Sequence, residues 1–124
     1  MEEKWKRKLT KVQYRVLAEK GTEIPFTSKF VKHSEKGKYI CVACGNVLFD
    51  SETKFNSYCG WPSFWDAKKG AVKFHTDKSF FIKRTEVVCA KCGGHLGHVF
   101  NDGPKEHGGK RFCINGVALG FKKK

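Results

Sequence analysis

Acidic residues and long apolar runs are both scarce in this chain of 124 residues. The longest unbroken apolar run, residues 39–44, has six residues, whereas a membrane-spanning helix needs about 20. The amino terminus reads MEEKWKRKLT and lacks the apolar segment of a secretory signal. We therefore expect no membrane span and no signal peptide, and a cytoplasmic location in which thiols stay reduced. Repeats of solenoid type and low-complexity segments are also absent.

The shortage of acidic residues leaves a large positive charge. Lysine and arginine number 25 against 12 aspartates and glutamates, so the net charge is +13. Such a charge permits attraction to nucleic acid or acidic partners without requiring it. Aromatic residues make up 14% of the chain, which argues against disorder. We expect one domain over residues 1–124, with residues 1–8 and 121–124 as basic tails.

Secondary-structure signals divide the chain into a helical lead-in and a β-rich remainder. Thr10 can cap a helix that runs to about residue 20, where Gly21 is placed to end it. Strand-like runs then alternate with glycine-rich turns. They cover residues 38–41, 47–49, 71–75, 80–84, 86–89, 98–100, 111–114 and 117–121. This spacing predicts a mainly β fold with an antiparallel core.

Two matching CxxC elements stand at the ends of predicted strands. They pair Cys41 with Cys44 and Cys89 with Cys92, and a glycine that can take a positive φ follows each. A single CxxC can be a redox pair, but two matching copies favour metal. Four thiolates form the closed shell of structural zinc, with iron as the alternative ion. We expect one structural Zn²⁺ that clamps distant parts of one sheet.

Cys59 and Cys113 remain once these four ligands are set aside. Free cysteines are often buried and inert, but the surroundings of both favour chemistry. If residues 111–114 form a strand, Arg111, Cys113 and Asn115 lie on one face. The guanidinium then favours the thiolate of Cys113, and the amide can donate a hydrogen bond to a substrate oxygen. This face is a candidate nucleophilic site.

A loop and a turn supply further candidate groups. Cys59 lies in a loop with glycine and proline, where a mobile thiol could resolve an oxidised partner sulfur. Trp61 in that loop is either a core residue or an apolar wall. His95 and His98 are turn residues, an extra metal ligand, or proton donors that the turn brings toward Cys113. The residues alone leave these alternatives open.

Several motifs occur in one order over residues 9–119. They are LT, QY, GTE and PF within residues 9–26, then the first CxxC, GWPSF at 60–64, the second CxxC, GHLGHVF at 94–100 and RFCIN at 111–115. Together they resemble the B-type methionine sulfoxide reductases, which reduce the R epimer of methionine sulfoxide. Two positions depart from the family pattern, because Tyr58 stands where a small residue is usual and Gly116 where serine is usual.

The resemblance implies a β-tent fold, in which two antiparallel sheets with short N-terminal helices hold a structural zinc site of four cysteines far from the active site. It implies that Cys113 is the nucleophile and Cys59 the resolving cysteine that forms a disulfide with it. It places Trp61 against the substrate methyl group. It places His95, His98 and Asn115 around the sulfoxide oxygen. It places Arg111 where it aids the thiolate.

The implied activity is repair of oxidised peptides and proteins. The oxygen of the sulfoxide would leave Cys113 as a sulfenic acid, which condenses with Cys59 and is recycled by thioredoxin. We expect a monomer with no membrane partner. A basic zinc module that binds nucleic acid is the main alternative, but no contiguous basic stripe surrounds the CxxC elements and it gives Cys59 and Cys113 no task. A thiol switch would keep both cysteines and need no substrate pocket.

Overall fold

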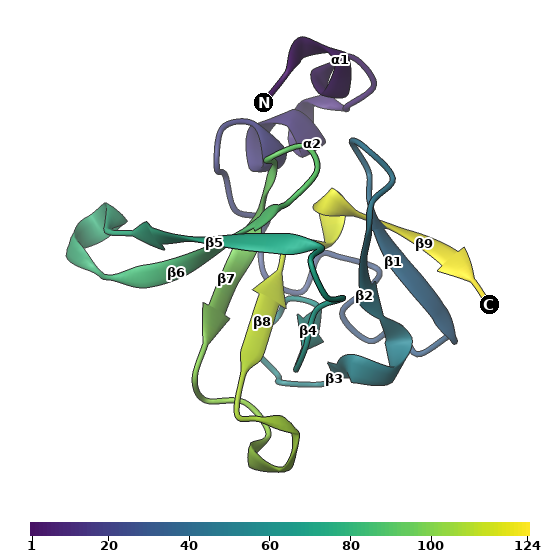
Figure 1. The fold of residues 1–124 in the computed structure, drawn as a ribbon, viewed down its shortest axis with the longest axis vertical. Helices are drawn as coiled ribbons and strands as arrows, with labels where there is room; N and C mark the ends of the chain where they lie inside the picture. Colours follow the sequence, from purple (N-terminus) through teal and green to yellow (C-terminus); the bar gives the residue numbers. More distant parts are fainter.

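The computed structural model describes residues 1–124, apart from the side chain of Phe80, and two antiparallel sheets dominate it (Figure 1). The smaller sheet has the order β2-β1-β9 and the larger one the order β3-β4-β8-β7-β6-β5. The smaller sheet consists of β1 (Gly37–Cys41), β2 (Val47–Asp50) and β9 (Leu119–Lys123). The larger one consists of β3 (Lys54–Phe55), β4 (Ser63–Phe64), β5 (Val72–Asp77), β6 (Arg84–Cys89), β7 (His95–Phe100) and β8 (Arg111–Ile114). The expected mainly β fold of two antiparallel sheets is confirmed.

The predicted helix is α2 (Lys11–Leu17), and a reciprocal cap fixes its start. The Thr10 hydroxyl accepts from the Gln13 amide at 3.2 Å, and the Gln13 side chain accepts from the Thr10 amide at 2.9 Å. The predicted end was wrong, because the helix stops three residues earlier and Lys20, not Gly21, takes the positive φ of 58°. Gly21 serves a close approach instead, since a Cβ there would lie 2.9 Å from the Arg15 carbonyl oxygen.

Parts of both segments expected as basic tails form secondary structure. Residues 3–6 form α1 (Glu3–Lys6), and Met1 and Trp5 pack against the core. At the other end, Phe121 and the two lysines after it belong to β9, which pairs with β1. Apolar side chains between the lysines favour these two elements, because burying apolar surface stabilises the folded chain. The longest helix in the described part of the chain has 7 residues, and none could cross a membrane.

The remaining strand predictions are confirmed in part. The runs at 38–41, 47–49, 86–89 and 111–114 fall in β1, β2, β6 and β8. The strand predicted at 80–84 is wrong, because η2 (Ser79–Phe81) occupies the tip of the β5–β6 hairpin and Phe81 has a φ of 60°. A left-handed residue cannot continue a pleated strand. The other short 3₁₀ helices are η1 (Ser51–Thr53), η3 (Lys105–His107) and η4 (Gly116–Ala118), the last of which precedes β9.

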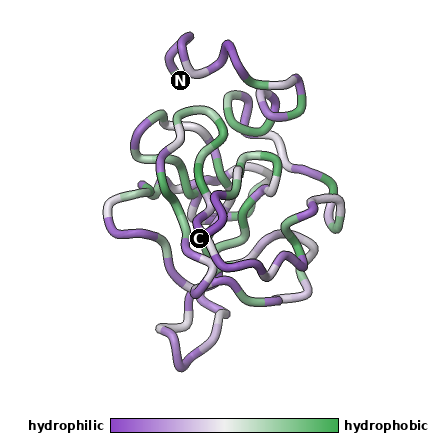
Figure 2. Tube along the Cα trace, turned by 90° about the vertical axis from the view of Figure 1, so that its right-hand side faces the viewer, coloured by the Kyte–Doolittle hydropathy of each residue, from purple (hydrophilic) through white to green (hydrophobic). Residues whose placement is uncertain are grey.

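Aromatic rings join the two sheets in the core. The rings of Phe49 on β2 and Phe64 on β4 stack with centroids 4.3 Å apart, and Tyr39 on β1 meets Phe64 edge-on at 5.1 Å. Phe112 on β8 approaches Phe49 at 5.8 Å. All four side chains are buried, and each contributes about 1.5–3 kcal/mol by leaving water. Figure 2 shows the apolar segments gathered in the interior.

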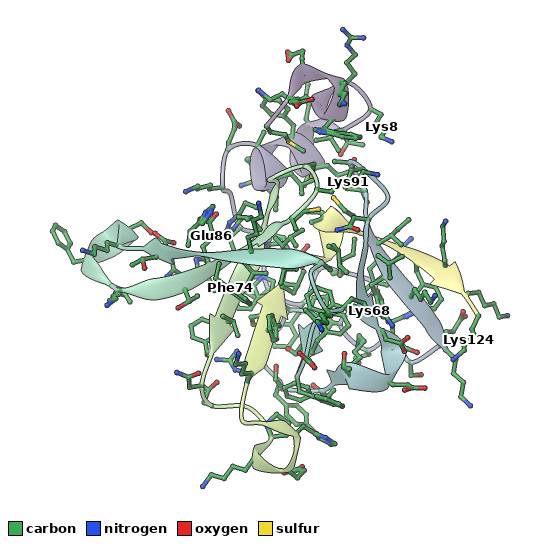
Figure 3. The ribbon with its side chains drawn as sticks, viewed as in Figure 1. Lys8, Lys68, Phe74, Glu86, Lys91 and Lys124 are labelled. Atoms are coloured by element: carbon green, nitrogen blue, oxygen red, sulfur yellow. The ribbon has the colours of Figure 1, made fainter. Side chains whose placement is uncertain are left out.

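The lysines lie on many sides of this core. Lys8, Lys68 and Lys124 are exposed and well separated in Figure 3. Charges distributed in this way act mainly as a solvated surface.

Strand β7 lies unusually close to β8, and this close approach positions the site described below. Gly97 faces Ile114, and His98 faces Cys113 in the antiparallel register. A Cβ at Gly97 would collide with the carbonyl oxygen of Cys113. The glycine therefore allows the backbone of β7 to approach the strand that carries the candidate nucleophile.

Candidate functional site

The four CxxC cysteines form one buried cluster. Their Sγ atoms all lie within 4.8 Å of one another. The Sγ atoms of Cys41 and Cys92 are 3.7 Å apart and those of Cys44 and Cys89 are 3.5 Å apart. Sulfurs that surround a zinc ion tetrahedrally at about 2.3 Å are about 3.8 Å apart. The donor set and its spacing therefore fit a metal ion with four sulfur ligands.

Each CxxC closes a turn of the same shape. The Gly45 amide donates to the Cys41 carbonyl at 2.8 Å, and the Gly93 amide donates to the Cys89 carbonyl at 2.8 Å. The φ angles of the two glycines are 78° and 76°, as predicted. One turn joins β1 to β2 and the other joins β6 to β7, so they belong to different sheets. The prediction of a clamp within one sheet is wrong, because the cluster links the two sheets.

A row of polar side chains crosses the larger sheet away from this cluster. In the strand register Ser63 faces Cys113, Cys113 faces His98, and His98 faces Glu86. Residues directly opposite each other in antiparallel strands point to the same face. The four strands β4, β8, β7 and β6 therefore present a hydroxyl, a thiol, an imidazole and a carboxylate side by side.

Cys59 lies against this row from the loop before β4. Its Sγ is 3.0 Å from the Sγ of Cys113, and both thiols are free and half-buried. The hydroxyl of Ser57 donates to the Cys59 sulfur at 2.9 Å, and the hydroxyl of Ser63 lies 3.4 Å from it. The two cysteines left over in the sequence are thus in contact, although 54 positions separate them.

The two thiols titrate as a pair. The hydrogen bond from Cys113 is the largest influence on Cys59 and, with the two serine hydroxyls, lowers the pKa of Cys59 to about 4 despite its burial. The same contact and burial raise the pKa of Cys113, whereas the charge of Arg111 lowers it. The pair therefore loses its first proton readily and its second with difficulty. One negative charge is held between the two sulfurs.

Arg111 and Asp102 hold a cation next to the thiols. The Nη1 atom of Arg111 donates to the Cys113 sulfur at 3.2 Å, while its Nε and Nη2 atoms donate to the two Asp102 oxygens at 2.8 and 3.2 Å. The guanidinium also lies 4.5 Å above the Phe100 ring. This two-pronged contact fixes the plane of the guanidinium and raises the pKa of Arg111. Arg111 was predicted from the sequence, whereas Asp102 was not.

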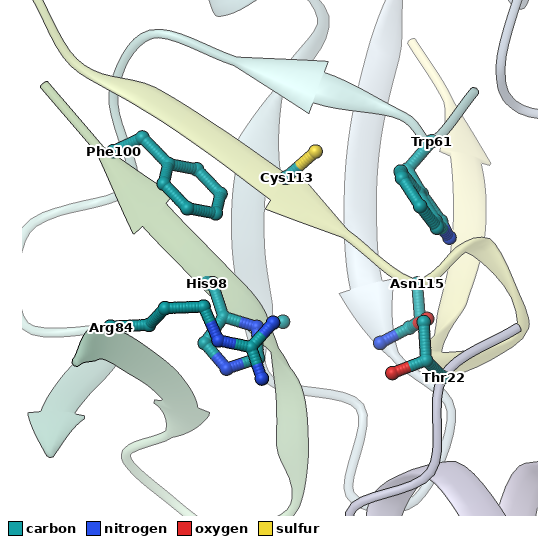
Figure 4. A pocket seen from close by; sticks show the side chains of 8 residues that line it. Thr22, Trp61, Arg84, His98, Phe100, Cys113 and Asn115 are labelled. Atoms are coloured by element: carbon teal, nitrogen blue, oxygen red, sulfur yellow. The ribbon is translucent and has the colours of Figure 1, made fainter. Parts of the chain in front are cut away.

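A small pocket opens beside the Cys113 thiol (Figure 4). Cys113 points into it between Phe100 and Trp61, with His98 and Asn115 below them in the figure. The cavity has a volume of about 80 Å³. Its lining residues are Thr22, Trp61, Arg84, Gly97, His98, Phe100, Cys113 and Asn115. Aromatic rings thus flank the thiol, and polar groups occupy the opposite wall.

His98 reaches the pocket and is held from behind by a carboxylate. Its Nε2 atom lies 2.9 Å from an oxygen of Asp77, which also accepts from Arg84 at 3.4 Å. The Ser79 amide, and after it the His98 ring, lower the pKa of Asp77. Asp77 is therefore an ionised acceptor for the imidazole near neutral pH. Neither Asp77 nor Arg84 was predicted from the sequence.

His95 lies in a second layer, where it does not line the pocket. Its side chain is buried, and its ring centroid is 5.4 Å from that of His98. The Nδ1 atom lies 2.7 Å from an oxygen of Glu86, whose carboxylate also approaches Lys20 at 3.4 Å and His75 at 3.8 Å. Burial lowers the pKa of His95 against the opposing effect of Glu86. A neutral ring that donates from Nδ1 leaves Nε2 as a buried acceptor, and no described residue bonds to that atom.

Buried Glu23 ties Asn115 and Trp61 together. Its backbone amide donates to the Asn115 Oδ1 atom at 2.9 Å, and its carbonyl accepts from the Trp61 indole at 3.1 Å. Its carboxylate accepts from the backbone amides of residues 116 and 117. The Asn115 Nδ2 atom donates to the Leu96 carbonyl at 3.0 Å, so only its second N–H remains for a ligand. Burial raises the pKa of Glu23 despite these amide donors.

Comparison with known proteins supports a single family. The family model for the SelR domain matches residues 9–123. Peptide methionine sulfoxide reductase MsrB of Methanosarcina mazei is 57% identical over 98% of this chain and 87% of its own length. The MsrB of Leptospira interrogans is 54% identical over 98% of this chain and 93% of its own length. This chain belongs to the B-type methionine sulfoxide reductases.

One animal protein and one remote solved structure are also similar to this chain. The probable methionine-R-sulfoxide reductase B of Caenorhabditis elegans is 49% identical over 97% of this chain and 80% of its own length. The Mis18 "Yippee-like" domain aligns with a TM-score of 0.58 at 17% identity, over 73% of this chain and 98% of that domain. At that identity the likeness concerns the fold alone. The members of the B-type family are oxidoreductases, and this chain is one of them.

Removal of the metal from the four-cysteine cluster should destabilise the chain. The cluster joins two sheets, so we expect a chelator or Cys44→Ser to lower the free energy of unfolding by several kcal/mol. Metal analysis and thermal unfolding would measure both effects. Cys59→Ser lies outside the cluster and serves as the control, with unchanged metal content. Purified protein with less than about half an equivalent of metal, or a metal-free variant with a normal melting temperature, would contradict the structural role.

Proposed function

We propose that this chain reduces methionine (R)-sulfoxide in peptides and proteins to methionine, and that it thereby repairs oxidised proteins. The main support for this proposal is the contact of 3.0 Å between the Cys59 and Cys113 sulfurs at the edge of a pocket. A nucleophile, an adjacent second thiol and donors for an oxygen are what the chemistry of a sulfoxide needs. Family membership supports the same reaction.

In the first step Cys113 attacks the sulfur of the sulfoxide. Moving the shared proton across the contact onto Cys59 leaves Cys113 as a thiolate beside Arg111. The sulfur–sulfur bond formed by this attack and the sulfur–oxygen bond of the substrate both break as the oxygen passes to the Cys113 sulfur. One proton, which His98 can supply, completes the sulfenic acid. The Cys113 sulfur is oxidised by two electrons as the methionine sulfur is reduced, so no external oxidant or reductant is used.

The polar wall of the pocket stabilises the oxygen during this step. His98 lines the pocket with Asp77 behind it, and Asn115 retains one free N–H. Either group can donate to the developing negative charge on the oxygen, and His98 can supply a proton. Trp61 lies on the opposite side in Figure 4, where its apolar face can receive the methyl group. Opposed apolar and polar walls select one epimer.

In the second step Cys59 condenses with the sulfenic acid. A sulfur–sulfur bond forms between Cys59 and Cys113, and the hydroxyl leaves as water with the Cys59 proton. A dithiol protein, thioredoxin in our proposal, then returns both cysteines to thiols and becomes oxidised itself. The disulfide needs no large loop movement, because the two sulfurs already touch.

Three further features belong to the proposal. The ion held by Cys41, Cys44, Cys89 and Cys92 is Zn²⁺, which fits four thiolates and contributes stability only. The chain works as a monomer, because pocket and thiols come from one copy. Its compartment is the cytoplasm, where thioredoxin keeps thiols reduced.

Cys113→Ser should abolish turnover, because serine cannot form the sulfenic acid. A coupled assay on separated R and S epimers of a methionine sulfoxide peptide measures this, with the wild type active on the R epimer alone. Thermal unfolding of the variant shows that it is folded. Steady-state activity in the folded variant would remove Cys113 as the nucleophile.

Cys59→Ser should keep one turnover and lose recycling by thioredoxin. The sulfenic acid still forms, but no neighbouring thiol condenses with it. Rapid-quench measurement should show about one methionine per chain, followed by a stalled sulfenic acid that a dimedone probe traps. Unchanged recycling by thioredoxin would show that a different thiol resolves the intermediate.

Glu86→Gln should slow the reaction through His95. We expect kcat to fall about 10- to 100-fold with KM unchanged, which is the loss usual for a group that orients another. The NMR signals of the His95 ring should show a changed ratio of its two tautomers. His95→Asn and the double variant complete a cycle, in which the double variant should be no slower than His95→Asn. His75→Asn, an exposed neighbour of Glu86, is the control. If the kcat losses of the two single variants multiply in the double variant, Glu86 does not act through His95.

A further inference from the structure

Three exposed apolar side chains stand next to one wall of the pocket. Ile24, Phe26 and Tyr58 are 70%, 68% and 82% exposed. Ordinary single exposed apolar residues need no explanation, but three that gather beside one site are typical of a binding surface. We call these three side chains the apolar rim.

Backbone contacts connect the rim to the pocket. Thr22 lines the pocket, and the carbonyl of Glu23 accepts from the indole of Trp61. The Phe26 amide donates to the Gly60 carbonyl at 2.7 Å, and a Cβ on Gly60 would lie 3.0 Å from the Phe26 ring. Residues 22–26 therefore run along the loop that carries the Trp61 wall. The apolar rim therefore adjoins the wall that Trp61 forms.

The backbone of the rim is costly for the residues that occupy it. Phe26 and Tyr58 have φ angles of 66° and 61°, in the left-handed region that favours glycine or asparagine. Burial of the two side chains offsets little of this cost, because both are mostly exposed. Such conformations cluster where a ligand is bound. Exposure and backbone strain thus occur together at two rings that lie beside the Trp61 wall, and this position indicates that they serve a partner.

Positive charge continues the surface beyond the rim. Phe26 lines a shallow groove together with Ser28, Lys29, Val31 and Lys32. Both lysines are exposed, and no acidic side chain lines this groove. The groove is therefore complementary to a segment that carries a carboxylate. The excess of cations over the whole chain favours the same charge in the partner.

We propose that the apolar rim and this groove bind an extended segment of the oxidised protein whose methionine sulfoxide occupies the pocket. A bulky apolar residue next to the sulfoxide packs on Phe26 and Tyr58, and an acidic residue farther along meets Lys29 and Lys32. This inference rests on the proposed function and adds a substrate class to it: sulfoxides in exposed apolar and acidic segments.

Four sulfoxide substrates test the proposal, with dithiothreitol as the reductant. The small probe is N-acetyl-methionine (R)-sulfoxide, and the three peptides have equal length. The first peptide carries leucines beside the sulfoxide and glutamates beyond them, the second replaces leucine by serine, and the third replaces glutamate by lysine. We expect kcat/KM for the first peptide to exceed that of the serine peptide about 10-fold, mainly through KM, as partial burial of one large side chain allows. The lysine peptide should be poorer than the first by the few-fold that exposed charge pairs contribute.

Matched variants identify the surface. Phe26→Asn and Tyr58→Asn remove a ring while asparagine keeps the left-handed backbone. Each should reduce the leucine preference to about threefold or less, leave the small probe unaffected and leave the melting temperature undiminished. Phe81→Asn is the control, because Phe81 is also exposed with a φ of 60° but belongs to the tip of the β5–β6 hairpin. In Figure 4 the Arg84 end of that hairpin lies across the pocket from Trp61.

Several results would overturn the proposal. Equal kcat/KM for the three peptides, with the small probe reduced, would remove the rim while the proposed function stands. An equal loss on the small probe would mean that the rings support the pocket itself. If thioredoxin replaces dithiothreitol and the variants raise only the KM for thioredoxin, with the peptide preferences unchanged, the rim belongs to the reductant. No reduction of any substrate by the wild type would remove the proposed function and this inference with it.

Discussion

Strand β8 pairs with β4 on one side and with β7 on the other, and the position of the Cys113 thiol depends on this register. It places Cys113 between Ser63 and His98 on one face of the sheet. A slip of one residue would turn the thiol to the opposite face. Gly97 protects the register, because its missing Cβ lets β7 approach the Cys113 carbonyl. The chemistry is thus built on backbone hydrogen bonds of the sheet.

A chain with few acids concentrates several of them around the site. Asp102 fixes Arg111, Asp77 fixes His98, and Glu86 fixes His95. Glu23 fixes the backbone beside Asn115. Each carboxylate contacts a group that itself faces the thiols or the pocket, or lies directly behind it. Orientation of donors by such partners lets a small pocket stabilise charge without reorganising during the reaction.

We propose that stability and chemistry depend on different thiols. The four-cysteine cluster joins the turn between β1 and β2 to the turn between β6 and β7, so it holds the two sheets together. The remaining two thiols lie in contact beside the pocket. A closed shell of four sulfur ligands has no open position for a substrate. Metal chemistry and thiol chemistry therefore do not compete for the same cysteines.

Local sequence determined the features that depend on neighbours in the chain. The CxxC-Gly turns, the Thr10 cap and the alternation that sets Arg111 and Cys113 on one face are all short-range consequences of backbone geometry. The motif order along the chain also identified the family. Errors of the sequence-based prediction also have local causes. The strand predicted at residues 80–84 does not form, because one residue with a left-handed backbone turns the chain there.

Short-range patterns do not determine which distant groups meet. Apart from the pairing of Cys59 with Cys113, which the family resemblance implied, only the tertiary structure decided these contacts. The contact between Cys59 and Cys113 depends on the order of β4 and β8 in the sheet, which periodicity within a strand does not encode. The same holds for Asp77, Glu86 and Glu23, whose carboxylates look like ordinary surface acids in the sequence. It also holds for the second-layer place of His95 and for the cluster that joins two sheets. Hydrophobic periodicity predicts which face of a strand or helix is buried, whereas strand order and register determine which residues that face contacts.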